Sequence, residues 1–193
     1  MKDILKTIAK SNLSVVKLGG MNEQMEAQGC YHVTCHDKEG NLKWEDFIEN
    51  VVVTVGKNLA LDTFLAGSGY TVVGPYMGLI SSVSYGAGPV AGDTMASHAG
   101  WTEAGSANAP TFAARIAPAW SAATGGAKAT SSAVSFTMTG AGTLKGCFIV
   151  TGSGAVTTIA STAGTLFSAG LFSGGDKVVA STDVVNVTYS VSM

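Results

Sequence analysis

Alternation of apolar and small polar residues is the feature that most limits the folds open to this chain. In SSAVSFTMTG, residues 131–140, every second residue from Val134 to Met138 is apolar, with Ser or Thr between them. Near the end, DVVNVTYSVSM shows the same alternation from Val185 to Val191. Because successive side chains of a β-strand point to opposite faces, each stretch predicts a strand with one buried face.

Short stretches of this kind recur through residues 30–193, separated by turns rich in Gly, Pro, Asn and Asp. They predict about eight strands, at the spacing typical of a sandwich or a barrel. We therefore predict a mainly β domain over residues 30–193, an antiparallel, jelly-roll-like β-sandwich. The sequence has no repeat of fixed period, which argues against a solenoid or a propeller.

Turn residues predict how some of these strands are connected. Residues 30–36 run into DKEGN and then into residues 42–55, which predicts a hairpin. The second of these strands has apolar residues at both odd and even positions, so we expect either a bulge or burial of both faces. The glycines within residues 140–142 predict another hairpin, between residues 132–139 and 143–150.

A single short helix is predicted over residues 55–66. In TVGKNLALDTFLAGSG, the side chains of Leu61, Phe64 and Leu65 share one face of a helical pattern. Gly67 then stands where a helix commonly ends on a glycine, so the predicted helix has only about three turns.

Residues 1–29 differ from the rest and are predicted to form an extended N-terminal arm. Ile4, Leu5 and Ile8 make an apolar stripe with helical spacing, and the glycines Gly19 and Gly20 interrupt the sequence after it. One helical turn is not stable alone in water. The arm is therefore either a disordered terminus or a segment that becomes ordered against a partner.

Charged residues are concentrated in the first third of the chain. Residues 1–62 hold 16 of the 24 acidic and basic side chains, and residues 63–193 hold the other 8. Globular domains usually carry about 25% charged residues, and a free monomer needs surface charge for solubility. We therefore expect neighbouring subunits to cover much of this neutral surface, as in a homo-oligomer. The alternative is a soluble β surface rich in Ser and Thr.

Net charge and cysteine content exclude several classes of partner and compartment. A formal net charge of −2 gives no basic surface for nucleic acid and no polybasic patch for a membrane. No apolar run reaches the ~18–20 residues that would span a bilayer, and the first residues lack the pattern of a secretory signal. The odd number of cysteines, 3, argues against a disulfide framework and favours a reducing cytoplasm as the place of synthesis.

Two cysteines and two histidines lie close together in GCYHVTCHDKEGN, which raises the question of a metal site. In a strand, Cys30, His32 and His36 share one face and Cys35 takes the other. His32 and His36 are then about 13 Å apart, at ~3.3 Å per residue, which is too far to share one zinc ion. The β-branched residues between them favour the strand over a helix, where the spacing would suit a metal. We predict no metal site.

The stretch GDTMASHAGWTE gathers polar residues of types that occur in active sites. Asp93, Ser97 and His98 are the residue types of a hydrolase triad, but triads are assembled from distant segments and the chain lacks a G-x-S-x-G motif. Trp101 beside Asp93 and Glu103 matches the combination of an aromatic ring with carboxylates used in carbohydrate sites. We predict instead an ordered polar loop, no catalytic residue and no cofactor.

Several stretches taken together resemble a widespread family of virion proteins from tailed bacteriophages. In chain order they are NLKWEDFIENVVVTVGKNLALDTFLAG, YMGLI, AGDTMASHAGWTE and a closing GD before VVNVTYSV. The resemblance covers roughly residues 40–193 and is most specific in DTMASHAGWTE. It implies a structural component of the particle and assigns no catalytic residue.

Within such a particle we expect a head decoration, or cement, protein that binds the major capsid protein and stabilises the assembled shell. Its location is then the virion, after synthesis in the host cytoplasm. A tail component (fibre, tube or adaptor) is the alternative, and a glycan- or receptor-binding virion module is the second alternative. The arm and the polar loop supply the interface candidates, which are Ile4, Leu5, Ile8, His98 and Trp101.

Overall fold

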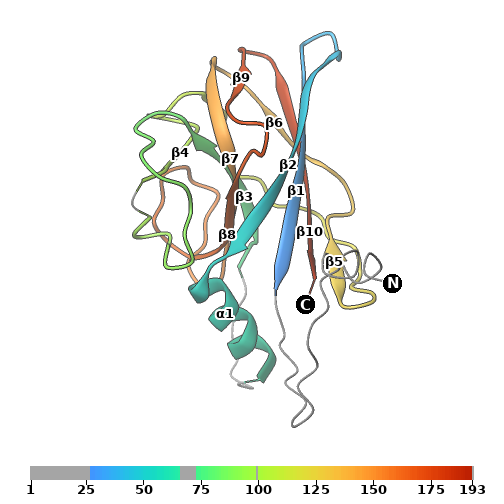
Figure 1. The fold of residues 1–193 in the computed structure, drawn as a ribbon, viewed down its shortest axis with the longest axis vertical. Helices are drawn as coiled ribbons and strands as arrows, with labels where there is room; N and C mark the ends of the chain where they lie inside the picture. The colour runs from blue at the N-terminus through green and yellow to red at the C-terminus, as the bar shows by residue number, and fades with distance from the viewer. Residues whose placement is uncertain (1–26, 66–72, 99, 193) are drawn as a thin grey trace, which may run out of the picture.

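The computed structural model describes residues 27–65, 73–98 and 100–192 of the chain (Figure 1). These residues form ten strands and one helix, so the predicted mainly β class with a single short helix is confirmed. The elements in chain order are β1 (Gln28–His36), β2 (Leu42–Val52), α1 (Thr54–Leu65), β3 (Tyr76–Ser81), β4 (Thr102–Glu103), β5 (Ala127–Ala129), β6 (Val134–Thr137), β7 (Gly142–Thr151), β8 (Thr165–Leu171), β9 (Lys177–Val179) and β10 (Val184–Ser192).

The strands form one antiparallel sheet that folds into two layers at β2. Their order is β4-β3-β7-β8-β2-β1-β10-β5, with β6 beside β10 and β9 beside β7. Residues 42–50 of β2 lie along β1, whereas Val51 and Val52 pair with β8. One layer therefore contains β1, β10, β5 and β6, the other contains β3, β4, β7, β8 and β9, and β2 joins them (Figure 1). The sandwich-like antiparallel arrangement is as predicted, with ten strands in place of eight.

The main core lies between the two layers. Val33 of β1, Ile48 of β2 and Val187 of β10 belong to one cluster of buried side chains with Leu79 of β3 and Ile149 of β7. None of these five side chains is more than 1% exposed. The alternation read from the sequence produces this core, because every second residue of each strand turns toward the opposite layer.

A second, smaller core covers the outer side of the layer that contains β7. Phe148 and Val150 pack there against Met95 and Trp101, which come from the long segment between β3 and β4. β7 is consequently buried on both faces. In contrast, burial alternates along β2, whose outward side chains are exposed. The two layers therefore differ, because long loops cover the outer face of one layer and leave that of β2 open.

The predicted hairpin between residues 132–139 and 143–150 is wrong, although both strands exist. β6 pairs with β10, and β7 pairs with β3, β8 and β9 in the opposite layer. The residues that connect β6 to β7 bind the segment between β4 and β5, because the backbone N–H groups of Thr139 and Gly140 both donate to the carbonyl of Thr111. Alternation identifies a strand with one buried face but does not select its neighbour.

The hairpin predicted for the first two strands is confirmed. β1 and β2 pair antiparallel on either side of the turn. The register shifts once, where Lys43 is the extra residue opposite Cys35 and His36, so this bulge lies before the mixed apolar positions of residues 44–52 and does not account for them. Burial of both faces of β2 is not found, since Phe47 is 54% and Val51 36% exposed. The outer face of this strand carries apolar side chains in contact with water.

α1 matches the predicted helix to within one residue at each end, but its buried side is different. Leu61 and Leu65 are 42% and 78% exposed, whereas Leu59 is 6% exposed. Gly56 lies directly on β8, because a Cβ added there would come within 2.5 Å of the carbonyl oxygen of Phe167.

Among the described residues, no helix is long and apolar enough to cross a bilayer.

Residues 1–26, with the stripe formed by Ile4, Leu5 and Ile8, lie outside the described residues, as does Gly67. The strand β1 begins at Gln28, one or two residues before the boundary predicted between arm and domain. The division into an arm and a single β domain stays a prediction.

Candidate functional site

The polar loop between β3 and β4 is built around a buried tryptophan. Trp101 is 2% exposed, and its indole N–H donates to Oδ2 of Asp93 over 2.9 Å. The same carboxylate oxygen accepts the backbone N–H of Val90 at 3.1 Å. The ring of His98 stacks on the indole with centroids 3.9 Å apart, and its Nδ1 lies 3.0 Å from the carbonyl oxygen of Trp101. The loop is therefore ordered by its own side chains.

These contacts agree with the predicted ordered polar loop and bear on the two functional alternatives raised for it. A carbohydrate platform needs an exposed ring, whereas Trp101 is buried and Glu103 is only 7% exposed. Asp93 binds the indole and a backbone N–H, so its carboxylate is engaged by groups other than His98. The interface candidate Trp101 is therefore buried, and its indole packs under the ring of the half-buried His98. A contact between His98 and a partner stays a prediction.

A buried ion pair joins β4 to the segment before β5. Arg115 is 1% exposed, and its Nε and Nη2 donate to the two carboxylate oxygens of Glu103 over 2.8 and 2.7 Å. The guanidinium also donates to the carbonyl of Ser161 at 2.7 Å, and Glu103 accepts the backbone N–H of Ala160 at 2.7 Å. Both charges are thus satisfied internally, and the pair holds the loop between β7 and β8 against β4.

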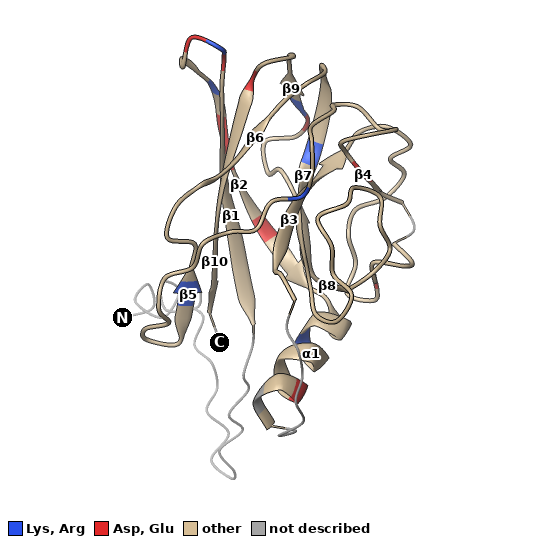
Figure 2. Ribbon diagram, turned by 180° about the vertical axis from the view of Figure 1, so that it is seen from behind, with Lys and Arg blue, Asp and Glu red and all other residues tan. Residues whose placement is uncertain are grey.

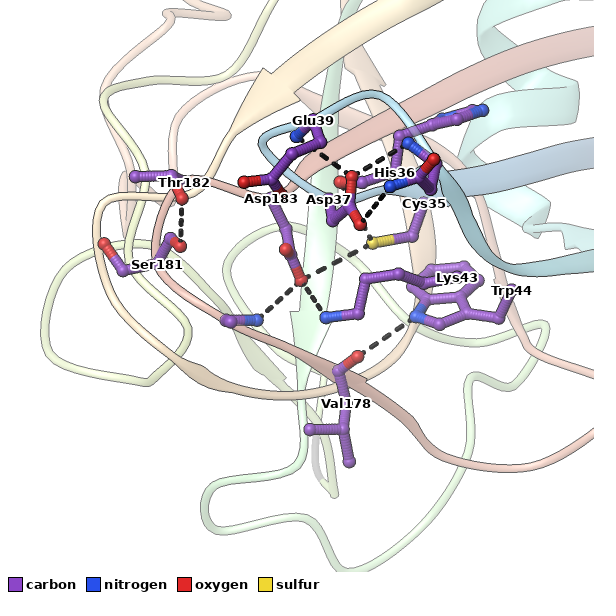
Figure 3. Close-up of polar contacts among 12 residues, drawn as sticks. Cys35, His36, Asp37, Glu39, Lys43, Trp44, Val178, Ser181, Thr182 and Asp183 are labelled. Atoms are coloured by element: carbon purple, nitrogen blue, oxygen red, sulfur yellow. Dashed lines mark hydrogen bonds and ion pairs between the residues drawn. The ribbon is translucent and has the colours of Figure 1, made fainter.

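Asp183 is the centre of a third polar cluster, near the turn of the β1–β2 hairpin (Figure 3). Its Oδ2 accepts the backbone N–H of Ala180 at 2.7 Å, forms an ion pair with Lys43 and lies 3.8 Å from the sulfur of Cys35. Burial and the charge of Asp183 raise the pKa of the Cys35 thiol to about 12. Cys35 is therefore a protonated thiol near neutral pH, which is a poor nucleophile and a poor metal ligand.

Asp46 forms a similar cluster on the inner side of β2. Its carboxylate lies 2.7 Å from Nζ of Lys177 and accepts hydrogen bonds from Ser173 Oγ at 2.7 Å and the Gly174 N–H at 2.9 Å. Burial acts to raise the pKa of Asp46, but these hydrogen bonds outweigh it and lower the pKa to about 2. Asp46 thus stays ionised and ties β2 to the turn before β9.

The cysteines and histidines of β1 lie on the faces predicted for them. Cys30, His32 and His36 are on the partly exposed outer side, and Cys35 faces the core. His32 contacts the carboxylate of Glu45 at 2.5 Å. The structure shows no group of three His, Cys, Asp or Glu side chains placed to hold a metal ion within its described residues. The absence of a metal site in the whole chain stays a prediction.

The surface is even less charged than the sequence indicates. Half of the eight charged side chains after residue 62 are buried, at 1–7% exposed, namely Asp93, Glu103, Arg115 and Asp183. Figure 2 accordingly shows few charged positions around the loops beside β4, while both signs gather at the tip of the β1–β2 hairpin. Sequence reasoning missed this burial. The sequence offers no clear signal for it, since Lys128 is equally isolated among small neutral residues and is exposed.

Comparisons with family models, with curated proteins and with solved structures give no match for this chain. The resemblance to virion proteins therefore remains an expectation from the sequence, and the function that follows is a proposal.

Proposed function

We propose that this chain is a structural component of a tailed-bacteriophage particle, a decoration protein that binds the major capsid protein and stabilises the shell. The observation that carries the proposal is the nearly uncharged surface formed by the described residues after residue 62, where half of the few charges are buried. Such a surface packs closely against a neighbour with little cost of desolvating charge. The virion assignment itself comes from the stretches that resemble phage proteins.

The internal use of the polar groups supports a structural role. Glu103, Arg115 and Asp183 each bind other groups of the same chain. These contacts brace the loops around β4 and the ends of the strands, so that the outer surface is held in one shape. A rigid, neutral body adds area at the seams of a symmetric shell, where many weak contacts act together.

Binding to assembled shells tests the proposal. Shells made without this chain are mixed with the purified protein, sedimented, and examined for bound protein and for the temperature at which they release DNA. We expect saturable binding and a higher release temperature. Protein that stays in the supernatant at all concentrations, with an unchanged release temperature, would contradict a decoration role.

The N-terminal segment is expected to contribute to this binding by contact with a neighbouring subunit. Deleting residues 2–20 should lower shell occupancy and remove part of the heat resistance, because the segment would no longer add contact area between neighbouring subunits of the shell. A matched control is a variant with residues 2–20 replaced by a Gly/Ser segment of equal length. If occupancy and heat resistance are unchanged after the deletion, residues 2–20 do not contribute to shell binding.

A tail component is the second candidate, because a mainly β, charge-poor chain suits a fibre, a tube or an adaptor equally well. Position in the particle separates the two, since a tail component would label the tail and leave shells unbound. Receptor or glycan binding has less support, since the tryptophan of the candidate carbohydrate site is 2% exposed.

A further inference from the structure

The outer face of β2 carries exposed apolar side chains interspersed with the glutamates Glu45 and Glu49, and it is uncovered in the described part of the chain. Leu42, Phe47 and Val51 are 57%, 54% and 36% exposed, and the ring of His32 from β1 stacks on Phe47 with centroids 4.6 Å apart. Loops cover the outer side of the other layer, but the described residues include no segment that covers this one. Exposed apolar side chains that follow one strand commonly mark a contact site.

A cavity of about 750 Å³ continues this face at the lower end of the sheet. Glu49 and Val51 belong to both, and the cavity is also lined by Gly29 and Cys30 of β1, Ser190 of β10 and Lys57 of α1. The cavity is open to solvent on one side, so it is a groove and not an enclosed pocket. The outer face of β2 and the cavity together form one surface, which we call the β2 groove.

One polar atom in the lining lacks a partner. Oδ1 of Asn50 is buried and accepts no hydrogen bond from the described residues, whereas the amide N–H of the same side chain donates to the hydroxyl of Tyr189 at 3.4 Å. A buried carbonyl oxygen without a donor costs free energy. Asn50 lies on the inner side of β2, with its side chain toward Tyr189 and Gly29, so this atom belongs to the end of the sheet and not to the outer face.

The sequence that precedes β1 has the composition to fill the groove. Residues 2–17 contain Ile4, Leu5 and Ile8 and carry four lysines against one aspartate, a net charge of +3. Residues 27–193 carry 7 basic and 10 acidic side chains, a net charge of −3. On the groove itself, Glu45 and Glu49 flank Phe47 along the same face of β2. The segment and the groove are therefore complementary in apolar character and in charge.

The chain is long enough for this contact to form within one molecule. The cavity is lined by Ala27 and Gln28, so the preceding sequence enters the described structure at the groove. Phe47 pairs with His32, about 13 Å along β1 from Gln28. Residues 18–26 reach about 30 Å when extended, which exceeds that distance. A tether this short gives an effective concentration on the order of millimolar, which favours the segment of the same chain over that of a second copy.

We propose that residues 2–17 dock in the β2 groove of their own chain in the free protein, with Ile4, Leu5 and Ile8 against Phe47 and Val51. This inference concerns the isolated molecule and holds whether or not the protein decorates a capsid. In a shell, the same contact offers a route to exchange, because the segment of one subunit fits the groove of the next equally well.

Hydroxyl-radical footprinting of the full-length protein tests the proposal, because it measures the solvent exposure of individual side chains by mass spectrometry. The test variant is Ile4→Asp with Ile8→Asp, and the matched control is Asn22→Asp with Gln24→Asp, which adds the same charge in the linking residues. We expect the oxidation rate of Phe47 to rise by up to about tenfold in the test variant, since an effective concentration of about 1 mM keeps a site with a Kd of about 0.1 mM roughly nine-tenths occupied. Val178, which is 67% exposed at the other end of the molecule, is the internal reference.

Two results would overturn the proposal. One is equal oxidation of Phe47 in the wild type, the test variant and the control. The other is protection of Phe47 that grows with protein concentration, together with a dimer in analytical ultracentrifugation, because that result assigns the groove to a second copy. The measurement involves no capsid, so its outcome and that of the shell-binding experiment are independent.

Discussion

Removing the guanidinium of Arg115 should destabilise the protein more than any change of an exposed charge. Arg115→Met keeps much of the apolar volume but leaves Glu103, which is 7% exposed, with only the Ala160 N–H among the donors described above. It also leaves the carbonyl of Ser161 without its 2.7 Å partner. Breaking a buried ion pair on one side typically costs about 3–5 kcal/mol. For a domain of this size that corresponds to a decrease of about 10 °C in Tm.

Urea unfolding followed by tryptophan fluorescence and by circular dichroism measures this cost. The control is Lys38→Met, since Lys38 and Glu39 form a pair 3.5 Å apart whose side chains are 70% and 58% exposed. An exposed pair contributes at most about 1 kcal/mol, so the control should unfold at nearly the wild-type midpoint. The double variant Glu103→Leu with Arg115→Met should recover part of the loss, because it removes both buried charges.

Two outcomes would refute this reasoning. Arg115→Met could be no less stable than Lys38→Met, which would mean that Arg115 is not desolvated in solution. Alternatively, the double variant could lose the sum of the two single losses, which would mean that Arg115 and Glu103 act independently.

Two further predictions concern stability. Asp46 has its pKa lowered from 3.8 to about 2 in the folded protein, so its contribution of about 2 kcal/mol is complete above pH ~5 and is lost as the pH falls toward 2. Urea unfolding across this range should show Asp46→Asn approaching the wild type at low pH, and a constant difference would contradict the ionised cluster. Gly56→Ala should cost about 1–3 kcal/mol because the new Cβ meets the Phe167 carbonyl oxygen at 2.5 Å. Gly92→Ala, with no atom within 4 Å of its added Cβ, should leave the Tm nearly unchanged.

Strand positions were predictable because alternation records burial directly. Val134 and Phe136 of β6 are buried as the sequence indicated, and the outward placement of His32 with the inward placement of Cys35 follows from the same rule. The predicted helix matches α1 to within one residue at each end. However, α1 contacts β8 through Gly56, and the predicted leucines Leu61 and Leu65 are exposed. A glycine gives no hydrophobic signal, although a close approach of two backbones requires one.

Long-range pairing was not predictable from local patterns. β6 and β7 are separated by a glycine turn in the sequence but lie in opposite layers, because the intervening residues bind Thr111. The contacts of Asp183 with Cys35 and Lys43 join residues about 140 positions apart in the chain. Such contacts form only when β2 joins the two layers of the sheet, and the sequence of a single strand does not indicate this arrangement.

The copy number of this chain in purified particles distinguishes a head decoration protein from a tail component. Quantitative mass spectrometry against labelled peptides of this chain and of the major capsid protein gives the ratio of the two. We predict a copy number comparable with that of the major capsid protein, because a decoration protein follows the symmetry of the shell. A handful of copies per particle would place the chain in the tail, and absence from the particle would contradict a virion role.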